Sequence, residues 1–348
     1  MKILALDLGK SKTVACILDT TTNAERFTTV KTVPFEMQDL VERFRPDRVV
    51  FEIGPQAGWV HELFSTKSVQ IQVANPNHEG WRWRSVKRKT DRLDALKLAR
   101  LSSMDQLPTV YMPSPAVRQR RSLIAYRKTV VERITAIKNH IRAILTRQGV
   151  SMPAGKGGWT ARSLGRLMTR ARPLEAVSAE DLWRGELHQE LALLSANQRA
   201  LGELEAKLNA LGRREGQVQR LRTIPGVGAR LAEAFVASVD DPRRFRTGRQ
   251  VGSYFGLTPR QYQSGSADRQ GRISGQGNRL VRSLLVEVSW LGLRTNEWMR
   301  AIYERVRRGS RSRKKIAIVA VARRLAVLCW ALMRYESRWG PAVASQAA

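Results

Sequence analysis

Short apolar segments separated by polar turns fill the first third of the chain, and this pattern restricts the fold more than any other feature. Three such segments follow one another over residues 2–6, 14–19 and 26–31. Aliphatic and β-branched side chains dominate them, which is typical of strands, and Thr and Asn residues between the second and third predict a tight turn. We therefore expect a three-stranded meander.

Helices and strands alternate after this meander. The expected elements are a helix at 35–44, a strand at 48–51, a helix at 61–64, a strand at 69–73 and a helix that begins near Asp91. A strand and turn at 107–115 are expected to close the domain. Alternation of this kind is typical of a sheet with helices packed on its faces, so the first domain is predicted to be α/β.

Four carboxylates fall at informative places in this pattern. Asp7 follows the first strand and Glu52 the fourth, while Asp91 and Asp94 lie three residues apart and share one helix face. A carboxylate at the tip of an apolar strand must be exposed, paired or bound to a metal. The alternative for the helical pair is capping, with Asp91 at the N-cap and Asp94 in the first turn.

A meander whose first strand ends in Asp, followed by Gly, resembles the opening of the ribonuclease-H-like fold and also that of actin-like ATPases. The order Asp7, Glu52, Asp91, Asp94 resembles the acidic tetrad of RuvC-like nucleases. Such a tetrad holds about two Mg²⁺ ions roughly 4 Å apart, and oxygen ligands suit this metal. An actin-like ATPase needs a second Asp-Gly phosphate loop in the C-terminal half, which the sequence lacks, as it lacks a P-loop.

The charge of the chain points to a polyanionic partner. Lys and Arg number 61 against 30 Asp and Glu, a formal charge of +31. An excess of this size repels itself unless DNA or RNA neutralises it; an anionic membrane surface is the alternative.

Membrane and export signals are weak. Residues 316–333 form an apolar run, but Arg323 and Arg324 at its centre would each cost about 2.5–3.5 kcal/mol in a bilayer. We expect a buried helix with a basic stripe. Asp7 interrupts the first apolar segment, which is therefore no signal peptide. Cys16 and Cys329 lack metal-ligand spacing, so we expect reduced thiols and a cytoplasmic, nucleoid-associated bacterial protein.

Two basic segments are candidate nucleic-acid contacts. In the first, aromatic and cationic residues alternate, so that bases can stack while phosphates are neutralised. The residues are Trp81, Arg82, Trp83, Arg84, Lys87, Arg88 and Lys89. The alternative is a surface helix with its Trp side chains packed inward. The second segment contains Arg313, Lys314 and Lys315, for which a solvated charge run is the alternative.

The middle of the chain carries two near-heptad apolar stripes, over 116–148 and 187–211, separated by a glycine-rich segment at 149–165 that we expect to be a flexible loop. The stripes predict either an antiparallel helical hairpin or pairing with another protomer, and we expect a homodimer or homotetramer. The predicted domains are a RuvC-like domain at 1–115, a helical coiled-coil spacer at 116–215, a mostly α-helical domain at 216–340 and a tail at 341–348. We expect the chain to fray from Trp339 onwards.

Residues 221–232 have the form of a helix-hairpin-helix. Gly226 and Gly228 permit a tight hairpin, and the backbone N–H groups of the following helix can hold a phosphate without reading sequence. The alternative is an ordinary tight turn between helices.

A resemblance now covers nearly the whole chain. The sequence resembles the insertion-sequence transposases that join an N-terminal DEDD RuvC-like domain to a C-terminal serine transposase domain, relatives of the Piv-type DNA invertases. The matching pieces are Asp7-Leu8-Gly9, Phe51-Glu52, Lys89-Thr90-Asp91-Arg92-Leu93-Asp94-Ala95, Ile224-Pro225-Gly226-Val227-Gly228, Gly256-Leu257-Thr258-Pro259, Ser264-Gly265, Gly271-Arg272-Ile273-Ser274 and Gly277-Asn278.

The resemblance implies an RNA-guided DNA recombinase. In that family the serine forms a covalent 5′-phosphoserine link to DNA, the tetrad binds Mg²⁺, and a structured bridge RNA pairs with donor and target DNA. By motif the serine is Ser264, with Ser266 and Ser274 as competitors, and Arg269 and Arg272 are expected to contact nucleic acid. Gly275-Gln276 stands where the family usually has Lys near position 275, so the resemblance does not carry a phosphate contact over to this position.

A serine hydroxyl needs activation by a base or a metal. The four histidines, at positions 61, 78, 140 and 188, are scattered, so the tetrad metals are the available activators. Two other functions remain open: a hydrolytic RuvC-like junction resolvase without a covalent intermediate, and a non-catalytic nucleic-acid-binding protein.

The basic segment at 313–315 generates the first prediction. Replacing Arg313, Lys314 and Lys315 together by Gln should weaken nucleic-acid binding equally for unrelated sequences. It should also lower the dependence of log K on log[salt] by about 0.9 for each duplex phosphate that the variant no longer neutralises. Fluorescence anisotropy across a salt series measures both quantities. An unchanged slope would assign these three charges to solvent.

Overall fold

The computed structural model describes residues 1–76, 90–264 and 267–340. The chain divides into two compact units, Met1–Arg118 and Gln119–Ala348.

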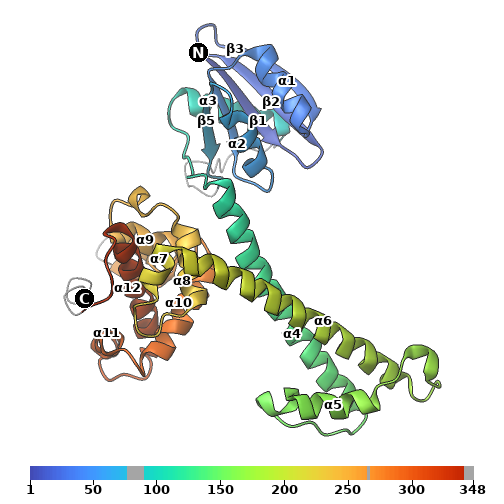
Figure 1. Cartoon of the computed structure of the whole chain (residues 1–348). Coiled ribbons are helices and arrows are strands. Elements are labelled where there is room, and N and C mark those ends of the chain that lie inside the picture. The colour runs from blue at the N-terminus through green and yellow to red at the C-terminus, as the bar shows by residue number, and fades with distance from the viewer. Residues whose placement is uncertain (77–89, 265–266, 341–348) are drawn as a thin grey trace. The chain divides into compact units, whose positions relative to one another are not determined.

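A five-stranded sheet forms the first unit, in the order β3-β2-β1-β4-β5 (Figure 1). Its strands are β1 Lys2–Leu8, β2 Lys12–Asp19, β3 Ala24–Lys31, β4 Arg48–Glu52 and β5 Gln70–Ala74. The β1–β2 and β2–β3 pairs are antiparallel, whereas β1–β4 and β4–β5 are parallel. The predicted meander is confirmed, and so are the two later strands.

Helices cover both faces of this sheet because its central strands are apolar on both sides. The helices α1 (Pro34–Phe44) and α2 (Ala57–Ser65) pack with Leu4, Leu6 and Phe51 on one face. The helix α3 (Asp91–Ser103) packs with Ile3, Ala5 and Val50 on the other. The α/β prediction for the first unit is therefore confirmed.

The stretch 107–115, expected to form a strand and turn, holds only an isolated antiparallel bridge between Ala74 and Thr109. Pro108 and Pro113 have no N–H to donate to a ladder, which explains why this stretch does not extend the sheet.

Two long helices begin the second unit. The helix α4 (Pro115–Arg147) and the helix α6 (Leu182–Arg214) pack antiparallel, and both apolar stripes meet inside one chain (Figure 1). Across them, His140 contacts Glu186 and Glu190 at 3.0 and 3.1 Å. Of the two arrangements that the stripes allowed, the hairpin within one chain is present.

The glycine-rich segment between these helices is not a plain loop. It contains a 3₁₀ helix, η2 (Gly155–Trp159), and then α5 (Ala161–Arg170), with a second 3₁₀ turn η3 at Leu174–Ala176. Thr160 caps α5 by accepting a hydrogen bond from the Ser163 N–H at 3.3 Å. The expectation of a flexible loop over 149–165 was wrong. It relied on the glycine content of the segment and overlooked Thr160 as the N-cap of a helix.

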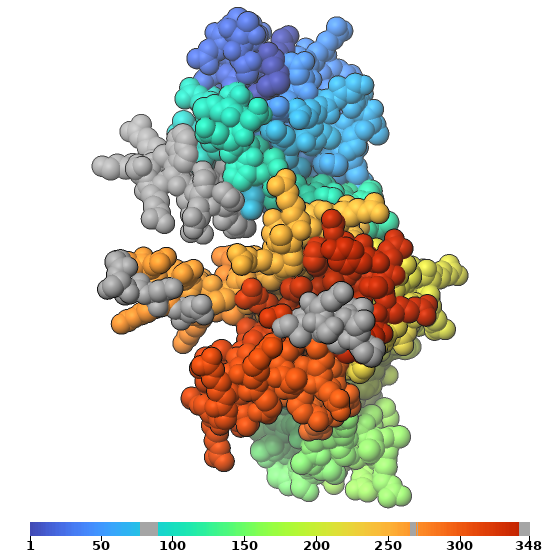
Figure 2. All heavy atoms as spheres, turned by 90° about the vertical axis from the view of Figure 1, so that its left-hand side faces the viewer, coloured from blue at the N-terminus to red at the C-terminus, as the bar shows by residue number. Residues whose placement is uncertain are grey.

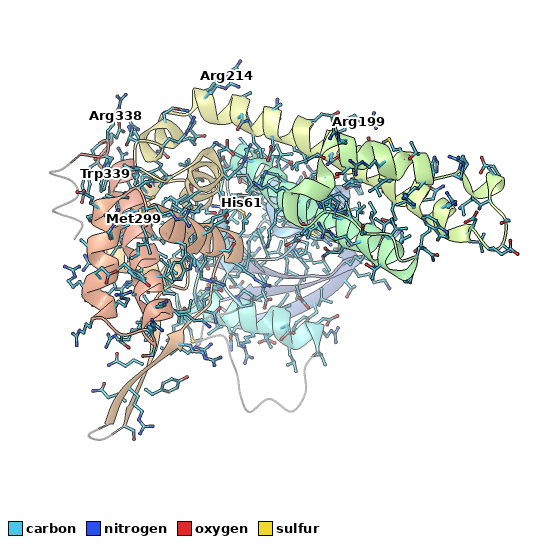
Figure 3. The ribbon with its side chains drawn as sticks, turned by 90° about the horizontal axis from the view of Figure 1, so that it is seen from below. His61, Arg199, Arg214, Met299, Arg338 and Trp339 are labelled. Atoms are coloured by element: carbon cyan, nitrogen blue, oxygen red, sulfur yellow. The ribbon has the colours of Figure 1, made fainter. Side chains whose placement is uncertain are left out.

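Short helices and a hairpin form the rest of the second unit. Their bounds are α7 Gly216–Leu221, α8 Ala229–Val239, η4 Pro242–Arg244, α9 Gly248–Tyr254, β6 Pro259–Ser264, β7 Ala267–Ile273, α10 Arg279–Gly292, α11 Glu297–Arg307 and α12 Lys314–Arg334. The core lies around α12 and includes Met299 of α11, labelled in Figure 3.

The apolar helix α12 is long enough to cross a bilayer, but most of its apolar stretch is buried in this core. The prediction of a buried helix is confirmed.

The chain stays packed beyond the point where we expected a frayed tail to begin. The Trp339 N–H donates to Thr223 Oγ1 at 2.9 Å, and the Trp339 ring lies 5.7 Å from the ring of Trp298, measured between centroids. The tail predicted at 341–348 lies outside the described residues.

Two glycines after β7 allow a matched stability test. Gly275 and Gly277 both have positive φ, +66° and +74°, but a Cβ on Gly277 would lie 1.9 Å from the Tyr254 carbonyl oxygen, whereas Gly275 has open space. Gly275→Ala should therefore cost only the left-handed backbone penalty, about 1–2 kcal/mol. Gly277→Ala should cost at least about 2 kcal/mol more, since the backbone must move.

Urea unfolding of the full chain, followed by tryptophan fluorescence, compares the two variants. Equal losses of stability would mean that the backbone around Gly277 accommodates a Cβ without further cost.

Candidate active site

Asp7 and Glu52 lie beside each other at the end of two parallel strands. The last paired residues of β1 and β4 are Leu6 and Phe51, and the two acids follow directly. Side chains alternate between the faces of a strand. Because Ala5 and Val50 face α3, Asp7 and Glu52 face it as well.

The direction of α3 is set by a buried arginine. Arg48, at the start of β4, donates from Nη1 to the Ser102 carbonyl oxygen at 2.8 Å and to Ser102 Oγ at 3.2 Å. Ser102 lies near the C-terminal end of α3, so the N-terminal end of the helix points towards the end of β4. The path from Arg48 to Glu52 is about 13 Å in a strand, and that from Ser102 to Asp94 about 12 Å in a helix. The structure therefore brings Asp91 and Asp94 to the end of the sheet that carries Asp7 and Glu52.

Thr90, not Asp91, caps α3. Its side chain accepts a hydrogen bond from the Leu93 N–H at 3.3 Å, which corrects the alternative that placed Asp91 at the N-cap. Asp91 is exposed in the first turn and Asp94 half-buried, where the helix dipole favours both negative charges. The capping role proposed for Asp91 therefore belongs to Thr90.

The turn after Asp7 is held in place from two sides. Gln56 Nε2 donates to the Gly9 carbonyl oxygen at 2.8 Å, and Thr32 Oγ1 donates to the same oxygen at 2.9 Å. These bonds hold the backbone directly after β1 and thereby the position of Asp7.

The four carboxylates lie at one edge of the sheet but do not converge on one metal position. In residues 1–76, 90–264 and 267–340, no three His, Cys, Asp or Glu side chains are arranged to hold one metal ion. Asp7, Glu52 and Asp94 each make a polar or electrostatic interaction within the fold. The donor atoms of the four acids are all carboxylate oxygens, which are ligands that suit Mg²⁺.

Ser264 ends β6 on an exposed hairpin. It pairs with Ala267 of β7, and the hairpin extends from the helical body of its unit (Figure 2). Ser274 lies at the opposite end of the hairpin, where its N–H donates to the Thr258 carbonyl oxygen at 2.8 Å. Ser266 lies outside the described residues. The structure thus separates Ser264 from Ser274 by position, with Ser264 towards the hairpin tip.

The base of the hairpin is tied to α10. Asn278 caps this helix by accepting from the N–H groups of Leu280 and Val281, and its Nδ2 donates to Ser238 Oγ at 3.0 Å. Arg282 donates to the carbonyl oxygens of Phe255 and Gln276 at 3.1 and 2.8 Å. The Gly277-Asn278 motif therefore anchors the hairpin that carries Ser264.

Some of the cations predicted to contact nucleic acid lie in the part of the chain that the structure describes. Arg269, Arg272, Lys314 and Lys315 have exposed side chains. Arg313 is half-buried and donates from Nε to the Val306 carbonyl oxygen at 3.1 Å, so part of its role is structural. The segment with Trp81, Arg82, Trp83, Arg84, Lys87, Arg88 and Lys89 lies outside the described residues.

Gly226 and Gly228 lie in the turn between α7 and α8. Gly226 has φ of +94°, and Gly228 is the exposed N-cap residue of α8. The glycines serve this turn as expected, while phosphate binding there remains a prediction.

The two cysteines are buried and are poor nucleophiles. Burial raises the pKa of Cys16 to about 12, and burial also raises the pKa of Cys329. Both thiols stay protonated at neutral pH, so neither competes with a serine as an attacking group.

Sequence reasoning missed the β6–β7 hairpin and the role of Arg48. The strand β6 contains Arg260-Gln261-Tyr262-Gln263, in which Tyr262 favours a strand. The other side chains are polar and fall on both faces, so the segment lacks the apolar alternation that distinguishes a strand from a loop. Nothing local marks Arg48, because its partner Ser102 is 54 residues away.

Comparison with known proteins agrees with this architecture. Residues 4–149 match the DEDD transposase model of the IS110 type, and residues 218–304 match the transposase IS116/IS110/IS902 family. The transposase for insertion sequence element IS1111A of Coxiella burnetii is 28% identical over 347 residues, covering 97% of this chain and 91% of that protein.

Two further relatives match over shorter stretches. The transposase for insertion sequence element IS1328 of Yersinia enterocolitica is 26% identical over 248 residues, covering 70% of this chain and 71% of that protein. The pilin gene-inverting protein of Moraxella bovis is 28% identical over 116 residues, 33% of this chain and 36% of that protein. The α/β unit with its carboxylate edge, the helical unit and these matches together identify the chain as a member of the IS116/IS110/IS902 family of insertion-sequence transposases.

Proposed function

We propose that this transposase is an RNA-guided DNA recombinase that cuts and rejoins DNA through a 5′-phosphoserine intermediate on Ser264. Asp7, Glu52, Asp91 and Asp94 would bind Mg²⁺, about two ions per site. The observation that carries the proposal is the meeting of these four acids at one edge of the sheet, although they come from two strands and a helix.

The covalent step is a phosphoryl transfer. Ser264 Oγ attacks the phosphorus, the bond from phosphorus to the 3′ oxygen breaks, and the serine proton ends on the departing 3′ oxygen. Bound Mg²⁺ would activate the hydroxyl and stabilise the leaving oxygen. The bond energy of the phosphodiester is kept in the protein link, so that strand exchange needs no ATP.

Activation by histidine is not supported. Of the described histidines, His61 lies on α2, His140 on α4 and His188 on α6, and none belongs to the hairpin that carries Ser264. Burial and the neighbouring Arg118 lower the pKa of His61, which remains neutral at pH 7. We therefore propose a carboxylate-bound metal as the activator.

Nucleic-acid binding is supported by the formal charge of +31 and by the exposed cations Arg269 and Arg272 on the hairpin that carries Ser264. One guide RNA and two DNA duplexes together supply the negative charge that such a chain needs. We propose that Gly226 and Gly228 contact phosphate independently of sequence. We further propose that the protein works as a homo-oligomer and that it is located in the bacterial cytoplasm, associated with the nucleoid.

The serine assignment predicts a covalent adduct. Wild-type protein with its RNA, DNA and Mg²⁺ should form a protein–DNA species that survives a denaturing gel. Ser264→Ala should abolish it because no oxygen remains to bond phosphorus, and Asp7→Ala or removal of Mg²⁺ should reduce it by at least about 100-fold. Ser274→Ala is the matched control and should retain the adduct, since Ser274 acts through its backbone.

Cleavage by wild type without any adduct would instead identify the hydrolytic junction resolvase. Binding without cleavage in every sample would identify the non-catalytic binding protein. An adduct that persists in Ser264→Ala would overturn the serine assignment.

A further prediction concerns whether serine and carboxylates act within one chain or between chains. If they act in trans, mixing inactive Asp7→Ala and Ser264→Ala proteins should restore part of the adduct, because mixed oligomers contain one intact set of groups. The adduct on the gel should then contain only the Asp7→Ala subunit, which a size tag identifies. No recovery from mixed oligomers would assign the chemistry to groups of a single chain.

A further inference from the structure

A groove of about 990 Å³ opens in the second unit where α9, the base of the β6–β7 hairpin and α12 meet. Its floor is aliphatic and includes Leu257, Ile273, Val319 and Val327. Glycine permits the close packing of α9 on α12 beside this groove, because a Cβ on Gly248 would lie 2.6 Å from Val327 Cγ1.

The rim of the groove is strongly cationic. Its charged lining residues are Arg249, Arg272, Lys315, Arg323 and Arg324, and no Asp or Glu belongs to the described lining. Positive charges gathered around one groove repel each other, and an anionic occupant reduces that repulsion. The occupant must therefore carry negative charges and also an apolar surface for the floor.

An unpaired nucleotide has both properties. Its phosphates suit an Arg and Lys rim, and the flat face of its base can lie on an apolar surface. A fully paired duplex offers only phosphates, since its bases remain stacked inside. The combination of an aliphatic floor with a cationic rim therefore favours a single strand over a duplex.

The position of the groove indicates which nucleic acid supplies this single strand. Pro259 and Arg272 belong to the hairpin that carries Ser264. From Pro259 to Ser264 the strand β6 spans about 16 Å, which is the length of about five stacked nucleotides.

We propose that this groove binds an unpaired segment of the DNA substrate about five nucleotides from the phosphate that Ser264 attacks. The location relative to Ser264 rests on the proposed function, whereas the preference of the groove for unpaired DNA does not. Arg249, Arg323 and Ile316 thereby join the substrate-binding surface.

The test is made in a Ser264→Ala background, so that binding is measured without any reaction. Ile316 lines the groove and is 59% exposed, so Ile316→Glu adds a carboxylate to the groove without disturbing the core. Leu291→Glu is the matched control, because Leu291 is 56% exposed on α10 and does not line the groove. The probes are a fluorescein-labelled single-stranded DNA, its duplex and an RNA of the same sequence.

Ile316→Glu should weaken binding of the single-stranded DNA by about tenfold, while the duplex changes less than about twofold. Leu291→Glu should leave both unchanged. Arg249→Ala should lower the salt slope for single-stranded DNA by about 0.7, the value for one phosphate of a single strand. Circular dichroism melts that match the parent confirm that each variant is folded.

Three results would overturn the proposal. Equal weakening of single-stranded and duplex DNA binding would show a general charge effect. Selective weakening of RNA binding would assign the groove to RNA. No change with any probe would mean that the groove binds a protein segment and not a nucleic acid. Each is independent of whether Ser264 forms an adduct, so the proposed function and this inference can fail separately.

Discussion

The hydrogen bonds of one buried arginine determine where the acidic residues of this transposase lie. Arg48 is 8% exposed and bonds to Ser102, Gln70 and Asp105, which joins the start of β4 to the C-terminal end of α3. A buried guanidinium is costly unless its donors are satisfied, so these bonds fix one register of the helix on the sheet. That register brings the first turn of α3, with Asp91 and Asp94, to the edge that carries Asp7 and Glu52.

The helical unit uses backbone geometry instead of buried charge to place its serine. Glycines with positive φ at 256 and 277 and the cap at Asn278 hold the base of the β6–β7 hairpin against α10. Ser264, at the end of β6, is exposed, while the base of the hairpin lines a cationic groove. An exposed serine on a hairpin with an anchored base would suit the nucleophilic role that we propose for Ser264.

Local pattern predicted the first unit well and the second unit unevenly. Strands and helices of the sheet domain follow from apolar periodicity, because each element buries a face that its own residues define. The failures have separate causes: prolines at 108 and 113 prevented a strand, an N-cap at Thr160 began a helix in a glycine-rich stretch, and Trp339 stayed packed against Trp298. The β6–β7 hairpin was missed because both of its faces are polar.

The sequence by itself determined the α/β class of the first unit, the two long helices, the cationic character and the candidate acids and serines. These depend on composition and on spacing along the chain. Only the tertiary structure decided that α3 runs opposite to β4, that both heptad stripes pair inside one chain, and that Ser264 and Ser274 lie at opposite ends of a hairpin. Each of these depends on contacts between residues far apart in sequence, such as Arg48 with Ser102, and no local pattern records which distant partner satisfies a buried group.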